Sequence, residues 1–566
     1  MQNNDKLQKL RHSAAHLLAH AVIELFPKTK LTIGPATKTG FFYDLLPETN
    51  FKEEDLITIA QRMEEIVTRN LPLTHEKMSK EDARKLYKDN PFKLELIDGI
   101  DFETVGIARQ GDFYDLCRGG HVFSTKKLKH FKLTNLSGAY WRADKNNQPL
   151  QRISGVVFPN ATALAEYEKK IEEAQKYDHR KLGKELNLFS FHQEGVGFPF
   201  FHAHGKTVLN TLTNYLRNLL QKDGYQEVST PPMLSDELWR QSGHYKHYKD
   251  NMYFSNVEDK SYALRPMNCP GSILIYKNRP HSFRELPLKL AEFGHVHRHE
   301  LSGVLHGLFR ARSFTIDDGH IYCTPEQIED EVLNVINMVM KVLKKFEFTN
   351  ITIGLSTKPE KAMGSDQLWE KAIQSLKNAL EKAGHPYVLQ EGEGAFYGPK
   401  IEFVIQDSMG RQWQCGTAQV DFFLPENFDL TYVASGGQKK RPVMIHRAIY
   451  GSFERFFAIL LEHYKGKLPF WLAPIQATVL TITDEQKEYA QNLYKTLQNS
   501  AVRVTIDDSS DQISAKIKTA QLQQVPWMLI LGKKEVENST ITLRHRSGKQ
   551  EFGLTLEQLQ EKIKEL

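Results

Sequence analysis

Apolar residues recur with two different spacings along the chain, and the changes between them divide it into sections. Residues 5–26 carry apolar side chains three and four positions apart, which predicts an amphipathic helix. A second helix is predicted over residues 53–69, and strand-like runs such as residues 73–78 follow it. We therefore expect an α+β domain over residues 1–160.

A charged segment follows this first domain. Residues 161–186 contain many lysine and glutamate side chains and few large apolar ones. That composition is typical of a solvated helix between two domains. The sequence therefore predicts a linker helix over residues 161–186.

The long middle section, residues 187–467, contains helical and strand periods in alternation. An amphipathic helix is predicted over residues 206–222, and another begins after Thr324, a residue type that can cap a helix N-terminus. A third, strongly apolar helix is predicted within residues 451–464.

Strand-like runs occupy the rest of the middle section. Residues 401–406 and 411–420 are two examples. Residues 293–320 read FGHVHRHELSGVLHGLFRARSFTIDDGH, which predicts two antiparallel strands joined by a long loop. Proline and glycine around Cys269 predict an irregular turn over residues 265–271.

The last section, residues 468–566, has a simpler pattern. Strand-like runs at residues 477–482, 503–507 and 527–531 alternate with amphipathic helices. This alternation is typical of a small α/β domain. The whole chain is thus predicted to be a multidomain α+β protein.

Composition agrees with several domains and restricts the compartment. The chain has 566 residues, which exceeds what one hydrophobic core supports, and its net charge of +5 permits anionic partners without demanding them. The amino terminus lacks the apolar segment of a signal peptide, and no apolar run is long enough to span a membrane. The four cysteines are far apart in sequence, so we expect thiols or metal ligands in a reducing cytoplasm.

The loop predicted within residues 293–320 carries candidate chemistry. Arg298 and Glu300 enter the loop, and Arg310, Arg312 and Phe314 leave it. Arginine binds phosphate through two parallel hydrogen bonds and an aromatic ring can stack on a base, so a nucleotide site is one interpretation. A basic hairpin with a solvated face is the other, and these residues alone do not choose between them.

A second candidate group lies in the first domain. His12 and His16 are one helical turn apart, and Cys117 and His121 are also four residues apart, after Asp115. Histidine and cysteine are zinc ligands, but the same groups could position a water molecule for hydrolysis. Buried structural histidines are a third interpretation. The spacing leaves all three open.

Basic residues accumulate in the last section. They would suit contact with RNA, and a solvated charged surface is the alternative. The residues concerned are Lys516, Lys518, Lys533, Lys534, Arg544, His545 and Arg546.

The assembled motifs resemble those of class II aminoacyl-tRNA synthetases. Three signatures of that class occur in order: a strand ended by proline at Pro231, an Arg-x-Glu element from Arg298 to Phe314, and a Gly-x-x-Glu-Arg sequence at Gly451. The strings MNCPG, LHGLFRARSFT, DDGHIYC, GAFYGPKIEF, WQCGT and MIHRAI are similar to those of the threonyl-tRNA synthetase family in particular, and the resemblance covers essentially the whole chain.

The resemblance implies both fold and activity. It implies an α+β editing domain over residues 1–160, a class II catalytic core built on an antiparallel sheet over residues 187–467, and an α/β anticodon-binding domain over residues 468–566. The implied function is that of a threonine–tRNA ligase, which joins L-threonine to tRNA(Thr) through a threonyl-adenylate at the expense of ATP. Hydrolytic editing of mischarged seryl-tRNA(Thr) is implied as well.

The resemblance also implies ligand sets. Zinc would be bound by Cys269, His320 and His446, with positions left for the amino group and hydroxyl of threonine, so that valine is rejected. Threonine would also be contacted by Asp318, Tyr397, Gln419 and Ser452. ATP, with magnesium, would be bound by Arg298, Glu300, Arg310, Phe314, Gln414 and Arg455. Catalysis would rest on Arg298, Arg455, Lys400 for the phosphates, and His244 near the terminal ribose of tRNA.

The remaining implied residues concern editing, the tRNA and assembly. Serine also has a hydroxyl and binds nearly as well, so a second, hydrolytic site is needed. It would comprise His12, His16, Lys93, Asp115, Cys117 and His121, without a required metal. The anticodon would be bound by Lys518, Glu535 and Arg544, and the enzyme would be a cytoplasmic homodimer without membrane association.

Some positions depart from the family pattern. Bacterial members usually carry a small leading domain before the editing domain, and this chain begins at the editing helix. Ser272 replaces a histidine and Ile316 replaces a glutamine, which removes a polar contact from the implied pocket. Gln523 and Gln524 replace a commonly basic pair.

Two other function classes compete with the ligase. One is a regulatory paralogue that binds RNA or threonine without charging tRNA, and such a protein would be expected to lose an ATP arginine or a zinc ligand. The other is a zinc hydrolase built on the first domain, which leaves two thirds of the chain unexplained.

Overall fold

The computed structural model describes residues 2–37, 39–144, 146–360, 362–407 and 410–565, and the chain divides into two compact units, residues 1–172 and 173–566. The boundary lies inside a helix, α5 (Ala161–Lys176). Among the described residues no helix is long and apolar enough to cross a membrane. Each unit is described by itself below.

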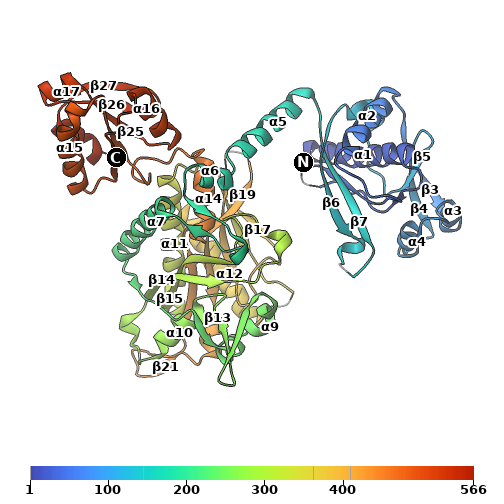
Figure 1. Cartoon of the computed structure of the whole chain (residues 1–566). Helices are drawn as coiled ribbons and strands as arrows, with labels where there is room; N and C mark the ends of the chain where they lie inside the picture. The colour runs from blue at the N-terminus through green and yellow to red at the C-terminus, as the bar shows by residue number, and fades with distance from the viewer. Residues whose placement is uncertain (1, 38, 145, 361, 408–409, 566) are drawn as a thin grey trace. The chain divides into compact units, whose positions relative to one another are not determined.

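The first unit combines helices with two small antiparallel sheets. The long helix α1 (Gln2–Leu25) and α2 (Asp55–Thr68) pack against a four-stranded sheet of order β1-β2-β7-β6, formed by β1 (Lys30–Leu31), β2 (Phe41–Leu46), β7 (Pro149–Phe158) and β6 (His130–Tyr140) (Figure 1). The apolar face predicted for α1 is buried, with Ala14, Leu17 and Leu18 fully covered. The polar face of α1 is therefore free to carry chemistry.

The second sheet of the first unit has the order β3-β4-β5. Its strands are β3 (Leu73–Ser79), β4 (Thr104–Gln110) and β5 (Phe113–Leu116), and helices α3 (Lys80–Leu86) and α4 (Pro91–Asp98) lie between the first two in sequence. Strand β5 ends directly before Cys117.

The charged segment after this unit forms two helices where a single one was predicted. Helix α5 has no buried residue, as a solvated helix should. Helix α6 (His179–Glu185) starts after Asp178, whose carboxylate accepts the Arg180 N–H, and it buries His179 and Leu182. The prediction of one solvated linker helix over residues 161–186 was therefore wrong for its second half, because Leu182 joins the core of the second unit.

The second unit is built on an eight-stranded sheet. Its order is β10-β14-β15-β22-β19-β18-β16-β17, and the pairs are antiparallel except at the two edges, β10 with β14 and β16 with β17. The strands are β10 (Gln226–Glu227), β14 (Leu288–His297), β15 (Ser313–Cys323), β22 (Val443–Ala448), β19 (Gln412–Asp421), β18 (Lys400–Gln406), β16 (Ile351–Ser356) and β17 (Tyr387–Gln390).

Helices cover one face of this sheet and leave the other for polar groups. The large core contains apolar residues of α7 (Ala203–Lys222), α11 (Ile328–Lys345), α12 (Asp366–Ala383) and α14 (Phe453–His463) together with Ile321 and Ile445 of the sheet. Side chains alternate between the faces of a strand, so His320 and His446 point to the opposite face. A second core, around helix α10 (Cys269–Lys277), covers part of that face.

Smaller elements surround the eight-stranded sheet in sequence. A three-stranded sheet of order β11-β13-β12 is formed by β11 (Met233–Ser235), β13 (Lys260–Leu264) and β12 (Tyr253–Val257), next to helices α8 (Asp236–Gln241) and α9 (His244–Tyr248). The two-stranded ribbons are β8 (Phe189–Ser190) with β9 (Phe200–Phe201), and β20 (Tyr432–Val433) with β21 (Lys439–Lys440). Helix α13 (Phe423–Asn427) follows β19.

The C-terminal residues form the predicted α/β arrangement. The sheet has the order β24-β23-β25-β26-β27, with strands β24 (Val504–Asp507), β23 (Ala477–Thr481), β25 (Trp527–Leu531), β26 (Ile541–His545) and β27 (Gln550–Leu554). Two apolar cores lie on its two faces, formed with α15 (Lys487–Asn499) and α18 (Leu556–Lys564) on one and α16 (Ile513–Leu522) on the other. The short helix α17 (Lys533–Asn538) joins β25 to β26.

Candidate active sites

Three residues that are far apart in sequence meet on the polar face of the large sheet. Cys269 begins α10, and His320 of β15 stands directly opposite His446 of β22 in the strand register. All three side chains are buried, and their donor atoms lie within 4.8 Å of one another. Cys269 begins a helix, with Pro270 in its first turn, so the predicted irregular turn over residues 265–271 was wrong at its end.

The polar partners of these residues leave one donor atom unsatisfied. Asp421 accepts a hydrogen bond from His446 Nε2 at 2.9 Å. The buried His320 Nε2 lies 3.6 Å from Asp318 Oδ1 and has no hydrogen-bond partner among the residues that the structure describes. Burial lowers the pKa of His320 and raises that of the Cys269 thiol, so neither group is stable as an ion in the absence of a counter-charge. A cysteine and two imidazoles in this state fit a divalent cation such as zinc.

A polar pocket adjoins this trio. The Tyr397 hydroxyl donates to Gln419 Oε1 at 2.5 Å, and the Tyr397 ring centroid lies 5.3 Å from that of His446. Asp318, two residues before His320, accepts a hydrogen bond from Asn268 Nδ2 at 3.2 Å. Asn268 was not among the predicted site residues, although it directly precedes Cys269.

His244 lies beside the trio, at the start of α9. Its side chain is buried, and Nδ1 is 2.8 Å from Ser242 Oγ while Nε2 is 3.1 Å from Met267 Sδ. The Cys269 sulfur is 3.8 Å from the same nitrogen. In this structure His244 is thus enclosed by protein atoms on both ring nitrogens.

A separate pocket collects most of the residues expected to bind ATP. The Arg298 guanidinium lies 5.1 Å from the centroid of the Phe314 ring, and Arg310 Nε pairs with Glu300 Oε2 at 3.1 Å. The pocket is lined by Arg298, Glu300, Leu308, Phe309, Arg310, Ala311, Phe314, Ser452 and Arg455. Three arginines converging on one hollow can bind a polyphosphate.

Three expected residues lie elsewhere than their assigned groups. Ser452, expected beside threonine, lines the pocket with the arginines, where it caps α14 and its hydroxyl accepts the Arg455 N–H. Lys400 and Gln414 instead meet at Glu402, whose carboxylate is 2.6 Å from Lys400 Nζ and 2.5 Å from Gln414 Nε2. The side chains of Lys400 and Gln414, which were expected to contact ATP, are therefore both bound to the Glu402 carboxylate in this structure.

The first unit contains a second cluster of histidines and cysteine. Cys117 Sγ lies 3.4 Å from His12 Nε2 and 3.3 Å from His121 Nε2, and the His16 ring is 5.0 Å from that of His121. Helix α1 supplies His12 and His16 from its polar face, and the segment after β5 supplies the other two. His20, one turn further along α1, contacts Glu24 and Gln110 instead.

Asp115 and Lys93 lie beneath this cluster and fix its charges. Asp115 pairs with Lys93 Nζ at 2.5 Å and with His16 Nδ1 at 3.3 Å, and all three side chains are buried. The Tyr43 hydroxyl also donates to Asp115, at 2.5 Å. Burial alone would raise the pKa of Asp115, but Lys93 and His16 outweigh it and hold the pKa below its ordinary value.

The same environment ionises the cysteine. Burial would raise the pKa of the Cys117 thiol, but hydrogen bonds from His12, His121 and His16 outweigh it and lower the pKa to about 3. Burial would lower the pKa of His16, and Asp115 with Cys117 instead raises it to about 9. A thiolate beside an imidazolium can hold a water molecule or a substrate carbonyl by charge-assisted hydrogen bonds.

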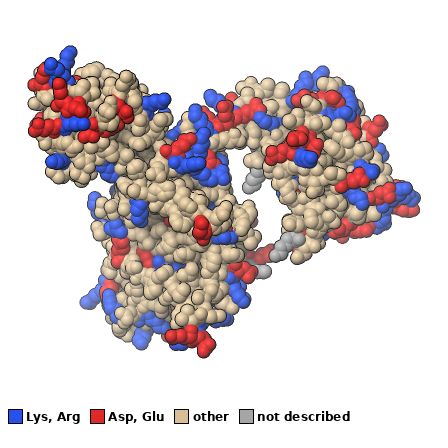
Figure 2. Space-filling view, viewed as in Figure 1, with Lys and Arg blue, Asp and Glu red and all other residues tan. Residues whose placement is uncertain are grey.

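The C-terminal domain uses some of its basic residues internally. Lys516 is buried and its Nζ donates to the Thr481 carbonyl at 2.9 Å, and Arg546 donates to the carbonyls of Leu468 and Lys467. The buried Lys516 therefore cannot contact RNA, whereas an RNA contact of the half-buried Arg546 stays a prediction. Acidic and basic side chains lie side by side on the visible face of this domain (Figure 2).

The three residues expected at the anticodon differ in exposure. Lys518 is exposed on α16. Glu535 is half-buried and accepts hydrogen bonds from the Gly532 N–H at 3.0 Å and from the Thr542 hydroxyl at 2.8 Å. Arg544 is half-buried on β26, and its Nε atom is buried without a hydrogen-bond partner.

Comparison with known proteins agrees with this arrangement. Residues 252–464 match the family described as tRNA synthetase class II core domain (G, H, P, S and T). Residues 476–566 match an anticodon binding domain, and residues 105–154 match the threonyl and alanyl tRNA synthetase second additional domain. The Carboxydothermus hydrogenoformans threonine–tRNA ligase is 52% identical over 562 residues, which cover 98% of this chain and 88% of that protein.

The chain belongs to the threonyl-tRNA synthetase family. The Clostridium tetani threonine–tRNA ligase is also 52% identical, over 95% of this chain and 84% of that one. A crystal structure described as the RNA binding domain of threonyl-tRNA synthetase from Cryptosporidium parvum Iowa II covers 69% of this chain and 98% of its own, with 44% identity and a TM-score of 0.67. A putative threonyl-tRNA synthetase from Aeropyrum pernix covers 69% and 95%, with 31% identity and a TM-score of 0.62.

Three positions that depart from the threonyl-tRNA synthetase pattern have definite surroundings. The buried Ser272 hydroxyl lies 2.9 Å from the Tyr322 hydroxyl, which satisfies both groups. Ile316 is half-buried and its backbone bridges to Ser452. Gln524 accepts a hydrogen bond from Arg546 through its carbonyl, so its position is part of the domain's internal structure.

Proposed function

We propose that this chain activates L-threonine with ATP and transfers it to tRNA(Thr), and that it hydrolyses seryl-tRNA(Thr). One observation carries the first part of the proposal. Strand β15 contributes Phe314 to the arginine-lined pocket and His320 to the cysteine–histidine trio. A nucleotide and an amino acid would therefore be bound side by side along a single strand.

In the proposed activation step, a carboxylate oxygen of threonine attacks the α-phosphorus and pyrophosphate leaves. Arg298 would bind the α-phosphate and the threonine carboxylate, which reduces their mutual repulsion. Glu300 would accept from the adenine edge while Phe314 stacks on its ring, and Arg310 and Arg455 would hold the γ-phosphate. Magnesium enters with ATP, and threonyl-tRNA synthetases use this pair. Lys400 and Gln414 would reach the nucleotide only by leaving Glu402.

Zinc would be held by Cys269, His320 and His446, whose thiol and imidazole donors fit it. When bound, it supplies open positions that accept the amino group and hydroxyl of threonine, and valine lacks the hydroxyl. Asp318 would accept the hydrogen bond of that hydroxyl. Tyr397, oriented by Gln419, would orient the amine, and Ser452 would contribute from the side of the ATP pocket.

In the proposed transfer step, a hydroxyl of the terminal ribose of tRNA attacks the carbonyl carbon of the threonyl-adenylate, the mixed anhydride bond breaks and AMP leaves. His244 would take the proton from the attacking hydroxyl, provided that Met267 yields its place at Nε2. His244→Ala is then expected to leave pyrophosphate exchange intact and to slow transfer. The anticodon would be bound by Lys518, Glu535 and Arg544.

Editing would take place in the first unit. Serine retains the hydroxyl and lacks one methyl group, which is worth only about 1–3 kcal/mol to the activation pocket, so seryl-tRNA will form. The ester of seryl-tRNA would bind between His12, His16, Cys117 and His121, with Asp115 and Lys93 holding their orientation. As the family resemblance implies, a positioned water molecule would hydrolyse the ester without a required metal, although the same four side chains are close enough to hold one.

The compartment and assembly follow from the same proposal. An enzyme that uses ATP and tRNA would work in the cytoplasm, and all four cysteines are unpaired. We propose a homodimer, because class II enzymes place the proline-ended strand near Pro231 at the subunit interface. A regulatory protein that binds without catalysis is less favoured, because Arg298, Arg310 and Arg455 all converge on the pocket.

Threonine-dependent exchange of labelled pyrophosphate into ATP by the purified protein tests the proposal. Exchange should require threonine, respond weakly to serine and fail with valine. Wild-type protein that binds ATP and shows no exchange with threonine would contradict the proposal and favour the regulatory protein.

A further inference from the structure

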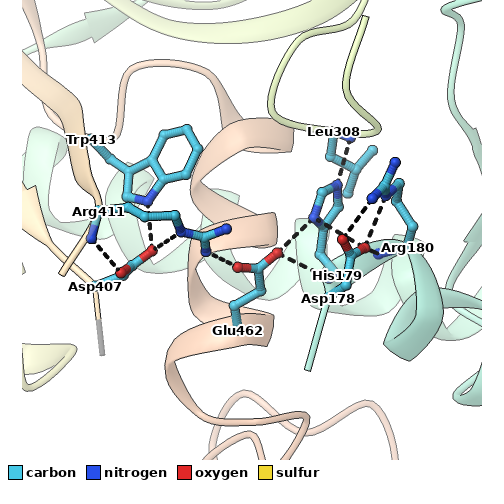
Figure 3. A network of polar contacts seen from close by, with 8 residues as sticks. All are labelled: Asp178, His179, Arg180, Leu308, Asp407, Arg411, Trp413 and Glu462. Carbon is cyan, nitrogen blue, oxygen red and sulfur yellow. Dashed lines mark hydrogen bonds and ion pairs between the residues drawn. The ribbon is translucent and has the colours of Figure 1, made fainter. Parts of the chain in front are cut away.

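A buried histidine of helix α6 contacts the loop that carries the phosphate-binding arginine. His179 is fully buried, its Nε2 accepts the Leu308 N–H at 3.1 Å, and its Nδ1 lies 2.8 Å from Glu462 Oε1 (Figure 3). The backbone N–H of His179 donates to the same carboxylate oxygen at 3.0 Å. Because Nε2 accepts, Nδ1 carries the proton and donates to Glu462.

Glu462 is in turn held by a second set of polar contacts. Its other oxygen, Oε2, pairs with Arg411, whose Nε pairs with Asp407 at 2.7 Å. Asp407 also accepts the Trp413 indole N–H at 2.9 Å. Figure 3 shows these residues as one row from β19 to the loop.

This row is a set of satisfied hydrogen bonds and not a metal site, although Asp178, His179 and Glu462 have ligand-type atoms close together. Asp178 pairs with Arg180 at 2.8 Å, and Glu462 already accepts from His179 and Arg411. A cation would have to displace these donors.

The loop around residues 307–310 packs directly against the His179 side chain. Gly307 has a φ of +50°, and a Cβ atom there would lie 2.2 Å from His179 Nε2, so the turn has no room for a side chain. The next-but-one residue, Phe309, places its ring 4.4 Å from the His179 ring and 3.9 Å from the Trp413 ring, with which it is stacked.

The same loop lines the pocket proposed for ATP. Leu308, Phe309 and Arg310 all line it, and the Phe309 carbonyl accepts a hydrogen bond from Arg455 Nε at 3.2 Å. Movement at Leu308 would therefore displace both Arg310 and the partner of Arg455.

We propose that His179, held by Glu462, is a positioning residue for ATP binding, which fixes the loop at Leu308 so that Arg310 and Arg455 face the terminal phosphates. This inference rests on the proposed use of the pocket for ATP. His179 touches no substrate, and its effect passes through the Leu308 N–H and the Phe309 ring. Through His179, the charged segment over residues 161–186 would thus contribute to nucleotide binding.

Two substitutions separate the two hydrogen bonds of His179. His179→Asn keeps an amide N–H where Nδ1 stands and removes the acceptor of the Leu308 N–H. His179→Gln places an amide oxygen near the position of Nε2 and can still accept from Leu308. Binding of ATP to each full-length variant is measured by calorimetric titration without threonine, together with the KM for ATP and for threonine in pyrophosphate exchange.

His179→Asn should weaken ATP binding roughly threefold to tenfold, the range expected for one lost buried hydrogen bond, and change the threonine KM less than twofold. His179→Gln should recover most of the affinity. His20→Asn is the matched control, because His20 is also buried and pairs with a glutamate, Glu24, at 3.1 Å, in the first unit. It should leave both constants unchanged.

Folded His179→Asn with wild-type affinity for ATP would overturn the inference, as would equal weakening of ATP and threonine by both variants. If His179→Asn does not fold, Trp413→Leu takes its place, because it removes the half-buried ring stacked on Phe309; unchanged ATP affinity there would be equally decisive against the inference. Wild-type protein that binds ATP without threonine-dependent exchange would contradict the proposed function alone.

Discussion

The two clusters of cysteine and histidine use the same residue types in opposite ways. In the first unit, Cys117 has its pKa lowered to about 3 because three imidazoles outweigh its burial. In the second unit, burial and then Asp318 and Asp421 raise the pKa of Cys269 well above its ordinary value. Both sets of donor atoms could hold a metal ion, but only the first has imidazoles and a lysine that stabilise its negative charges. The two clusters therefore differ in their neighbouring charges and not in their residue types.

The largest expected effect is at Cys269. Cys269→Ser should lose bound zinc and threonine activation together, by at least about a hundredfold in exchange rate, because the remaining donors are two imidazoles. Metal content by mass spectrometry and pyrophosphate exchange measure it. Cys323→Ala, a buried cysteine on the same strand as His320, should keep both. Stoichiometric zinc in Cys269→Ser would contradict the proposed difference between the two clusters.

The next effect concerns the cluster that carries its own charges. His12→Ala should slow hydrolysis of seryl-tRNA by about 10²- to 10⁴-fold and leave threonylation unchanged, because general acid–base groups contribute on that order. Deacylation of preformed seryl-tRNA measures it, and removal of metal ions should have no effect. His20→Ala, one turn away on α1, is the control. Normal deacylation by His12→Ala would refute the editing assignment.

A smaller effect is expected from the carboxylate behind His446. Asp421→Asn removes the negative charge that accepts from Nε2, and such supporting groups typically contribute tenfold to a hundredfold to metal affinity. Competition with a chelator measures the zinc affinity, which should fall while the fold persists. Asp429→Asn, at an exposed ion pair with Arg441, is the control. Equal zinc affinity in Asp421→Asn and wild type would show that His446 needs no support.

The smallest effect is a pH dependence in the first unit. The pKa of His16 is raised from 6.5 to about 9, so its stabilisation is fully present below pH 6.5 and is lost as the pH rises through about 9. Hydrogen exchange of the α1 amides in wild type and His16→Gln should therefore converge between pH 7 and 9.5. A difference in amide exchange between wild type and His16→Gln that stays constant over that pH range would contradict a protonated His16.

Much of the fold could be predicted because its periodicity is local. Strand β18 was predicted to begin one residue late, and α7 three residues late, since apolar spacing marks the middle of an element better than its ends. The burial of His179 was not predictable from its charged surroundings. It depends on Leu308 and Glu462, which are 129 and 283 residues away in sequence.

The residues of the candidate sites also differ in how well the sequence could predict them. The cysteine and the histidines could be named because the family strings contain them, but Asp421 carries no motif and acts only through His446. Lys400 and Gln414 were expected at ATP, and both contact Glu402 instead. Lys400 does so from two residues earlier on β18, and only the Gln414 contact depends on the pairing of β18 with β19. Lys516 reads as a surface lysine in sequence, and only the neighbouring strand ends, with their free carbonyls, explain its burial.

Strand β15 places a limit on how this gene can change length. Phe314 and His320 lie on the same face of β15, six residues apart, which is about 20 Å along the strand. The strand therefore fixes the distance between the residue proposed to stack on adenine and the residue proposed to hold the metal. A single inserted or deleted codon between them would turn His320 toward the apolar core and bring Gly319 or Ile321 to the metal side. Substitutions such as the isoleucine at position 316 keep this spacing and can be tolerated. Insertions of whole codons between Phe314 and His320 change it and should be eliminated by selection.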